Sequence, residues 1–71
     1  MRKATYKIDR QSVKAEMAKR EWSQENLSHE SGVAYVTISA ALNGKTVLKD
    51  TVNKIANALG VEMESILEKI N

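Results

Sequence analysis

Apolar residues recur at helical spacing along this chain, and the pattern is strongest in its last third. One set at positions i, i+3, i+4 and i+7 consists of Val52, Ile55, Ala56 and Leu59. A second set with the same spacing consists of Met63, Ile66, Leu67 and Ile70. Because side chains three and four residues apart share a helix face, each set predicts one amphipathic helix. Asp50 or Thr51 can cap the first of these helices, and Gly60 can end it.

A shorter helix is expected near the start of the chain. Asp9 is suited to cap a helix over about residues 10–20, in which Val13 and Met17 share one face. Trp22 follows this helix, and we expect its ring to close over the core.

Two further short helices are expected in the middle of the chain. Ser23 can cap a helix over about residues 24–30, although Asn26 stands where a capping box has Glu or Gln. Gly32 is placed to end that helix in a left-handed conformation. The next helix covers about residues 34–42, and its inner face would consist of Ile38, Ala41 and Leu42. With no strand predicted, five short helices indicate an all-α fold, a compact bundle.

Charge is distributed unevenly over the 71 residues, a length that suits one small domain. Residues 1–20 carry seven basic and two acidic side chains, a net charge of +5. Residues 21–71 carry four lysines against seven acids, a net charge of −3. A basic front half can face an anionic partner such as nucleic acid. Charge alone suits an ordinary solvated surface about equally well, so at this point we divide the chain only into a basic N-terminal arm, residues 1–8, and a helical domain, residues 9–71.

Composition excludes several classes of protein. The chain has no cysteine, so it forms no disulfide framework and no thiolate metal site. No apolar run approaches the length of a membrane span, and no apolar signal segment follows the basic start. We expect a cytoplasmic protein that uses no metal, no cofactor, no membrane and no small-molecule ligand. His29 is the single histidine, and without a partner base or nucleophile it does not indicate an enzyme.

The segment from Gln24 to Lys45 meets the packing demands of a helix-turn-helix. Two short helices joined by a tight turn need apolar anchors, a small residue at the crossing and a glycine in the turn. These positions are filled by Leu27, Ser28, Gly32, Val33, Ile38 and Ala41. Ser31 departs from the pattern, because an apolar residue is expected there.

The chain resembles the phage-repressor-like helix-turn-helix domains, the XRE-type regulators that include lambda repressor. The resemblance covers roughly residues 10–68 and is carried by WSQENLSHESGVAYVTISAALNGK and TVNKIANALGVEMESIL. It implies a lambda-repressor-like bundle of five helices with helices two and three as the helix-turn-helix. It also implies a bacterial or phage-encoded transcriptional regulator, typically a repressor, that inserts residues 34–43 into the major groove of double-stranded DNA.

The resemblance implies roles by position. Three residues match those that approach the phosphate backbone, namely Gln24, Asn43 and Lys45. The positions that face the bases are occupied by Tyr35, Val36, Thr37, Ser39 and Ala40. This second set departs from the family pattern, because it contains no Arg, Lys, Gln or Asn to read guanine or adenine by paired hydrogen bonds. We expect modest specificity, directed at thymine-containing steps and aided by DNA shape.

Two more surfaces are open to interpretation. The basic residues in and next to the arm are Arg2, Lys3, Lys7 and Arg10. They could follow the DNA backbone or enter the minor groove, or the arm could be a solvated tail. The apolar C-terminal stripe is more often core, but part of it could join two copies into a homodimer through Met63, Ile66 and Ile70. Such a dimer would place its recognition helices about 34 Å apart, one turn of DNA.

One alternative function remains at this point. A domain of the same fold could act as a protein-interaction module, as an antitoxin or co-regulator does, with little DNA binding of its own. The weak set of base-facing residues favours this alternative, whereas Gln24, Asn43 and Lys45 favour DNA. Retention on heparin separates the two, because a DNA-binding surface is retained and released by salt.

Overall fold

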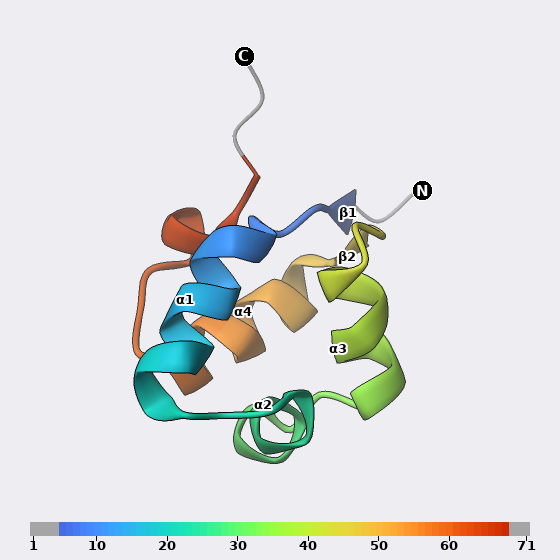
Figure 1. The fold of residues 1–71 in the computed structure, drawn as a ribbon. Coiled ribbons are helices and arrows are strands. Elements are labelled where there is room, and N and C mark those ends of the chain that lie inside the picture. Colours follow the sequence, from blue (N-terminus) through green and yellow to red (C-terminus); the bar gives the residue numbers. More distant parts are fainter. Residues whose placement is uncertain (1–4, 69–71) are drawn as a thin grey trace.

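Helices make up most of the chain in the computed structural model, which describes residues 5–68 (Figure 1). The elements in order are β1 (Thr5–Tyr6), α1 (Arg10–Arg20), α2 (Gln24–Ser31), α3 (Tyr35–Leu42), β2 (Val47–Leu48), α4 (Lys49–Leu59) and a 3-10 turn, η1 (Met63–Ile66). No helix within these described residues is long and apolar enough to cross a membrane. The helical bundle predicted from the sequence is therefore present, with four α-helices and one small two-stranded ladder.

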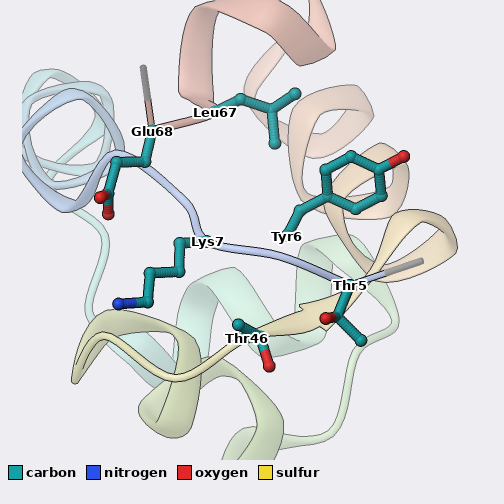
Figure 2. Close-up of a pocket in the computed structure, with 6 residues that line it drawn as sticks. All are labelled: Thr5, Tyr6, Lys7, Thr46, Leu67 and Glu68. Carbon is teal, nitrogen blue, oxygen red and sulfur yellow. The ribbon is translucent and has the colours of Figure 1, made fainter. Parts of the chain in front are cut away.

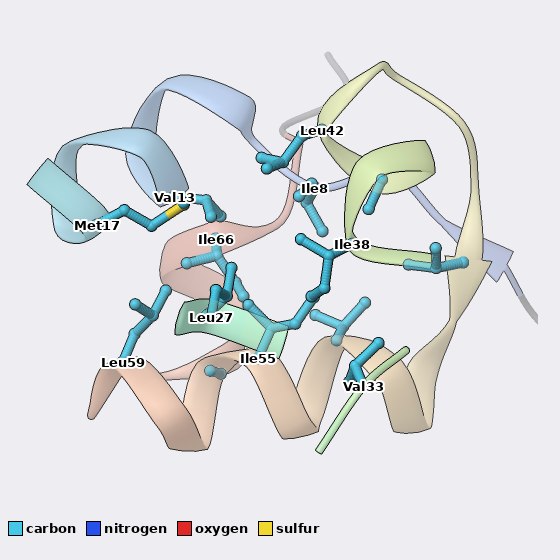
Figure 3. Packing of buried hydrophobic residues seen from close by; sticks show 14 residues of the cluster. Ile8, Val13, Met17, Leu27, Val33, Ile38, Leu42, Ile55, Leu59 and Ile66 are labelled. Carbon is cyan, nitrogen blue, oxygen red and sulfur yellow. The ribbon is translucent and has the colours of Figure 1, made fainter. Parts of the chain in front are cut away.

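The core gathers around the apolar face of α4. All four residues of its predicted stripe are buried, which confirms the first helix pattern: Val52, Ile55, Ala56 and Leu59. Figure 3 shows Leu27, Ile38 and Ile66 converging above this helix from three different elements. Burial of these large aliphatic side chains is the main force that holds so small a domain together.

Local capping sets where the first two long helices begin. Asp9 caps α1 by accepting a hydrogen bond from the Ser12 backbone N–H at 3.3 Å. Ser23 caps α2, and the Asn26 side chain accepts from the Ser23 backbone N–H at 2.8 Å. The capping box is therefore complete, because the Asn26 amide oxygen serves in place of the expected carboxylate.

Helix α4 begins earlier than its sequence suggested. Neither Asp50 nor Thr51 caps it, because both already lie inside the helix and Leu48 takes the N-cap position without a side-chain hydrogen bond. Leu48 is fixed there by its pairing with Thr5 in the two-stranded ladder. Pairing across the chain therefore decides this helix start, and local capping preference does not.

The predicted fifth helix is a single 3-10 turn, so the prediction of five helices was wrong. The chain leaves η1 at Leu67 in an extended conformation, with φ −85° and ψ 141°. Leu67 forms an antiparallel bridge with Ile8, and the Glu68 backbone N–H donates to the Lys7 carbonyl at 2.9 Å. These hydrogen bonds replace the ones that would have continued a helix. Ile70 lies outside the described residues.

The segment from Thr5 to Ile8 is part of the folded domain. Thr5 and Tyr6 pair antiparallel with Leu48 and Val47. Ile8 is 2% exposed and lies in the core cluster. The part of the expected arm that the structure describes is thus held by backbone pairing and by one buried side chain.

Arg20 connects the end of α1 to the end of α4. Its guanidinium donates to the Leu59 carbonyl, lies 5.6 Å from the centre of the Trp22 ring, and pairs with the Glu16 carboxylate at 2.9 Å. Hydrogen bonds from Arg20 and then from Lys19 lower the pKa of Glu16 below its ordinary value of 4.5. The partly buried side chain of Trp22 packs against the core, as expected.

Candidate nucleic-acid interface

The turn between α2 and α3 is built from backbone and hydroxyl hydrogen bonds. Gly32 takes a left-handed conformation with φ 74°, and its N–H donates to the Ser28 carbonyl at 2.9 Å. The Ser28 hydroxyl donates to the Val33 carbonyl across the turn. Because the side chain of Val33 is buried, the turn is anchored to the core and the direction of α3 is fixed.

Ser31, the residue that departs from the sequence pattern, has a hydrogen-bonding role. Its hydroxyl oxygen accepts from the Val33 backbone N–H at 3.2 Å, and the hydroxyl donates to the Ser28 carbonyl at 3.4 Å. It satisfies a backbone N–H that the turn would otherwise leave unpaired. A polar residue at this half-buried position is therefore compatible with the helix-turn-helix.

Helix α3 presents a sharply divided surface. Its inner face is buried and consists of Ile38, Ala41 and Leu42. On the outer face Val36 is 74% exposed and Tyr35 is 49% exposed. Thr37, Ser39 and Ala40 are half-buried at the flanks. The predicted base-facing residues thus lie together on one helix, which the core holds in place from behind.

The residues predicted to contact phosphate lie at the two ends of the helix-turn-helix. Gln24 is the first residue of α2 and is half-buried. Asn43 and Lys45 follow α3 with exposed side chains. The backbone N–H groups of both donate to the Ala40 carbonyl at 3.1 Å, and Gly44 between them has φ 90°. A hydrogen-bonded turn therefore fixes where Asn43 and Lys45 leave the helix.

Lys7 lies beside this turn because of the β1–β2 register. Thr5 pairs with Leu48 and Tyr6 with Val47, so the next position places Lys7 opposite Thr46. Lys7 and Thr46 line a pocket of about 260 Å³ together with Tyr6, Leu67 and Glu68 (Figure 2). Lys7 is exposed and lies next to Thr46, although 39 residues separate the two in sequence. Arg10 is exposed at the first turn of α1.

Other residues of the expected arm and interface are placed differently or not described. Arg2 and Lys3 lie outside the described residues. Ile66 is fully buried beneath η1, so it belongs to the core of one chain and is not available to a second copy. Met63 is half-buried against the same core.

An open groove beside Tyr35 was not anticipated from the sequence. It has a volume of about 620 Å³ and is lined by Tyr35, Glu25, Ser28 and His29. Glu25 and His29 are four residues apart on α2, a spacing that places them on one helix face. That spacing is the signal that could have identified them. Among the residues described here, no cluster of three or more His, Cys, Asp or Glu side chains could hold a metal ion.

A helix-turn-helix whose second helix is exposed along its outer face is an architecture of nucleic-acid-binding domains. A profile of the helix-turn-helix family matches residues 13–66, most of this chain. The chain therefore belongs to the helix-turn-helix family of XRE-type, lambda-repressor-like domains. This family is a family of DNA-binding regulatory domains.

A solved structure of a mutant hydroxyethylphosphonate dioxygenase contains a region of the same fold. It aligns with a TM-score of 0.79 over 92% of this chain at 17% identity, and the match spans 14% of that chain. At this identity the similarity shows the fold alone. No curated protein was found to match the sequence.

Proposed function

We propose that this domain represses transcription by inserting α3 into the major groove of operator DNA. The observation that carries the proposal is the division of α3 into a buried inner face and an outer face on which Val36 is 74% exposed. The major groove admits an α-helix, and a core-anchored helix reaches the base edges without ordering itself on binding. The residues that face the bases are Tyr35, Val36, Thr37, Ser39 and Ala40.

The register of bound DNA would be set by phosphate contacts on both sides of α3. Gln24 supplies one at the start of α2, and Asn43 and Lys45 supply others after α3. We include Lys7 in the second group, because it lines a pocket with Thr46, the residue that directly follows Lys45. Arg10 extends the basic surface along α1. Lys7 would then act as a fixed phosphate contact within the domain.

We further propose that two copies bind one operator, so that the pair of α3 helices spans about one DNA turn. Met63 is half-buried and could take part in this contact, whereas Ile66 is buried in the core and could not. Occupying the operator as a dimer in the bacterial or phage-infected cytoplasm would block transcription. Light scattering across protein concentrations tests the dimer, and a constant monomer mass would count against it.

One observation favours a second candidate function. Val36 is an exposed aliphatic residue on the proposed DNA surface, and exposed apolar surface can also mark a protein-interaction site. A protein-interaction module would use α3 to bind an apolar partner and would show little affinity for DNA. We infer no enzymatic activity in either case, because His29 is the single histidine, is exposed, and stands beside Ser28, whose hydroxyl is engaged with the Val33 carbonyl.

Fluorescence anisotropy with a pool of random 20-base-pair duplexes tests DNA binding directly. The wild-type protein is measured at several salt concentrations, together with Gln24→Ala, Lys45→Ala, Lys7→Ala and the control Lys54→Ala. Each true phosphate contact contributes about 0.9 to the slope of log affinity against log salt. Lys54→Ala removes the same charge from the exposed face of α4, where it pairs with Asp50.

The proposal expects salt-sensitive binding by the wild type and a slope reduced by about one in Lys45→Ala and in Lys7→Ala. Lys54→Ala should keep the wild-type slope. Equal slopes for Lys45→Ala and Lys54→Ala would mean that the turn after α3 does not contact phosphate. No binding by the wild type even at low salt would reject DNA recognition by this domain and favour the protein-interaction module.

A further inference from the structure

The outer face of α3 offers aliphatic groups, hydroxyl groups and one aromatic ring. Val36 and Ala40, one helical turn apart, offer aliphatic methyl groups. Tyr35, Thr37 and Ser39 offer hydroxyl groups, and Thr37, which is half-buried, also carries one methyl group. From Tyr35 to Leu42 there is no amide and no cation, so the helix has no side chain that forms paired hydrogen bonds with guanine or adenine.

Hydroxyl groups cannot choose among the pyrimidines on this face. A hydroxyl donates or accepts a hydrogen bond as its partner requires. It therefore suits the O4 acceptor of thymine and the N4 amino donor of cytosine equally. The remaining feature by which aliphatic side chains distinguish base pairs in the major groove is the methyl group at pyrimidine C5.

We propose that α3 recognises C5-methyl groups of pyrimidines, with Val36 as the specificity-determining residue. The preferred duplexes carry thymine at the contacted positions, and 5-methylcytosine is accepted there because it presents the same methyl group. The inference rests on the proposed insertion of α3 into the major groove and names what that helix reads. It follows from the exposure of Val36 together with the absence of any stronger reader on the helix.

Val36 is well placed for such a contact. It lies in the first turn of α3, the end that reaches base edges in helix-turn-helix complexes. Its side chain is 74% exposed in the free protein, so contact with a methyl group removes new apolar surface from water. Burial of one methyl-sized group changes an affinity roughly fourfold. The expected discrimination between thymine and uracil is therefore roughly fourfold for each methyl group contacted.

The experiment compares DNA with and without the C5-methyl group. Duplexes are enriched from a random pool with the wild-type protein and amplified with either thymidine or deoxyuridine triphosphate, so that the two pools share one set of sequences. Affinities are measured by anisotropy for the wild type, Val36→Ala and Val36→Ile. Because Val36 is exposed, neither substitution should affect folding, and circular dichroism checks this.

The proposal expects the wild type to bind the thymine pool at least roughly fourfold tighter than the uracil pool. This ratio should be kept in Val36→Ile, which retains the methyl groups, and should fall toward one in Val36→Ala. The change in the ratio measures the coupling of this side chain to the methyl group. A second pair of duplexes carries cytosine or 5-methylcytosine at the position where replacing thymine weakens binding most. The duplex with 5-methylcytosine should bind more tightly than the duplex with cytosine.

Two results would overturn the inference while leaving DNA binding intact. Equal affinity of the wild type for the thymine and uracil pools would show that no methyl group is read. A ratio unchanged in Val36→Ala would show that another side chain reads it. Failure of the wild type to enrich any duplex would instead reject the proposed function, and with it this inference.

Discussion

Ile8 tests whether the N-terminal segment belongs to the folded domain. Its side chain is 2% exposed, and its neighbours on both sides form backbone hydrogen bonds to the C-terminal segment. Replacing a buried Ile by Val costs about 0.5–1.5 kcal/mol, and replacing it by Ala costs about 2–5 kcal/mol. A domain of this size rarely has more than about 3–5 kcal/mol of stability from its core.

The expected results follow from these magnitudes. Ile8→Val should lower the melting temperature by about 5 °C, because about 1 kcal/mol corresponds to roughly 4–8 °C in a domain of this length. Ile8→Ala should leave much of the protein unfolded at 25 °C. Thermal unfolding followed by far-UV circular dichroism measures both effects. Lys7→Ala is the matched control, since its exposed side chain should change stability by less than about 0.5 kcal/mol.

Melting curves of Ile8→Val and Ile8→Ala that match the wild type would refute this reasoning. Residues 5–8 would then be a detached arm, and Lys7 would not be fixed beside Thr46. A large effect of Ile8→Ala combined with no effect of Lys7→Ala would support the placement of this segment within the core.

Three further outcomes are expected. Gly32→Ala should cost about 1–2 kcal/mol in chemical denaturation, because an alanine at φ 74° is strained, and no loss would refute the left-handed turn. Arg20→Lys should lower the melting temperature, because a lysine cannot both reach the Leu59 carbonyl and lie over Trp22, and an unchanged temperature would deny this connection. The lowered pKa of Glu16 stabilises the fold above pH 4.5, and this contribution is lost as pH falls through the folded-state value. Glu16→Gln should therefore be less stable than wild type at pH 7, and the difference should shrink toward pH 3; a constant difference would contradict the pairing.

The sequence predicted those elements whose structure is decided by the type and spacing of neighbouring residues. The stripe of α4 and the left-handed Gly32 required only spacing and residue type, and the structure confirms both. The 3-10 turn at residues 63–66 was not predictable in this way. Its apolar spacing suits a helix equally well, and the competing factor is a strand pairing with Ile8 that is distant in sequence.

The candidate interface was predictable in composition and less so in arrangement. The residue types on α3 are visible in the sequence, and the family resemblance assigns their positions. That Lys7 lies next to Thr46, and that Leu67 pairs with Ile8, depends on backbone pairing between segments about 40 to 60 residues apart. Periodicity carries no information about such pairings, because it reports only on neighbours within one helix.

The bridge between Ile8 and Leu67 has a consequence for how the domain is made. Ile8 leaves the ribosome 59 residues before Leu67 does. Contacts between such distant residues form late, because closing a long loop costs chain entropy before the contact stabilises it. The growing chain can form its helices early, but its core closes only once residues 66–68 have been released. Stalled synthesis before that point would leave Ile8 and its neighbours exposed to aggregation and proteolysis.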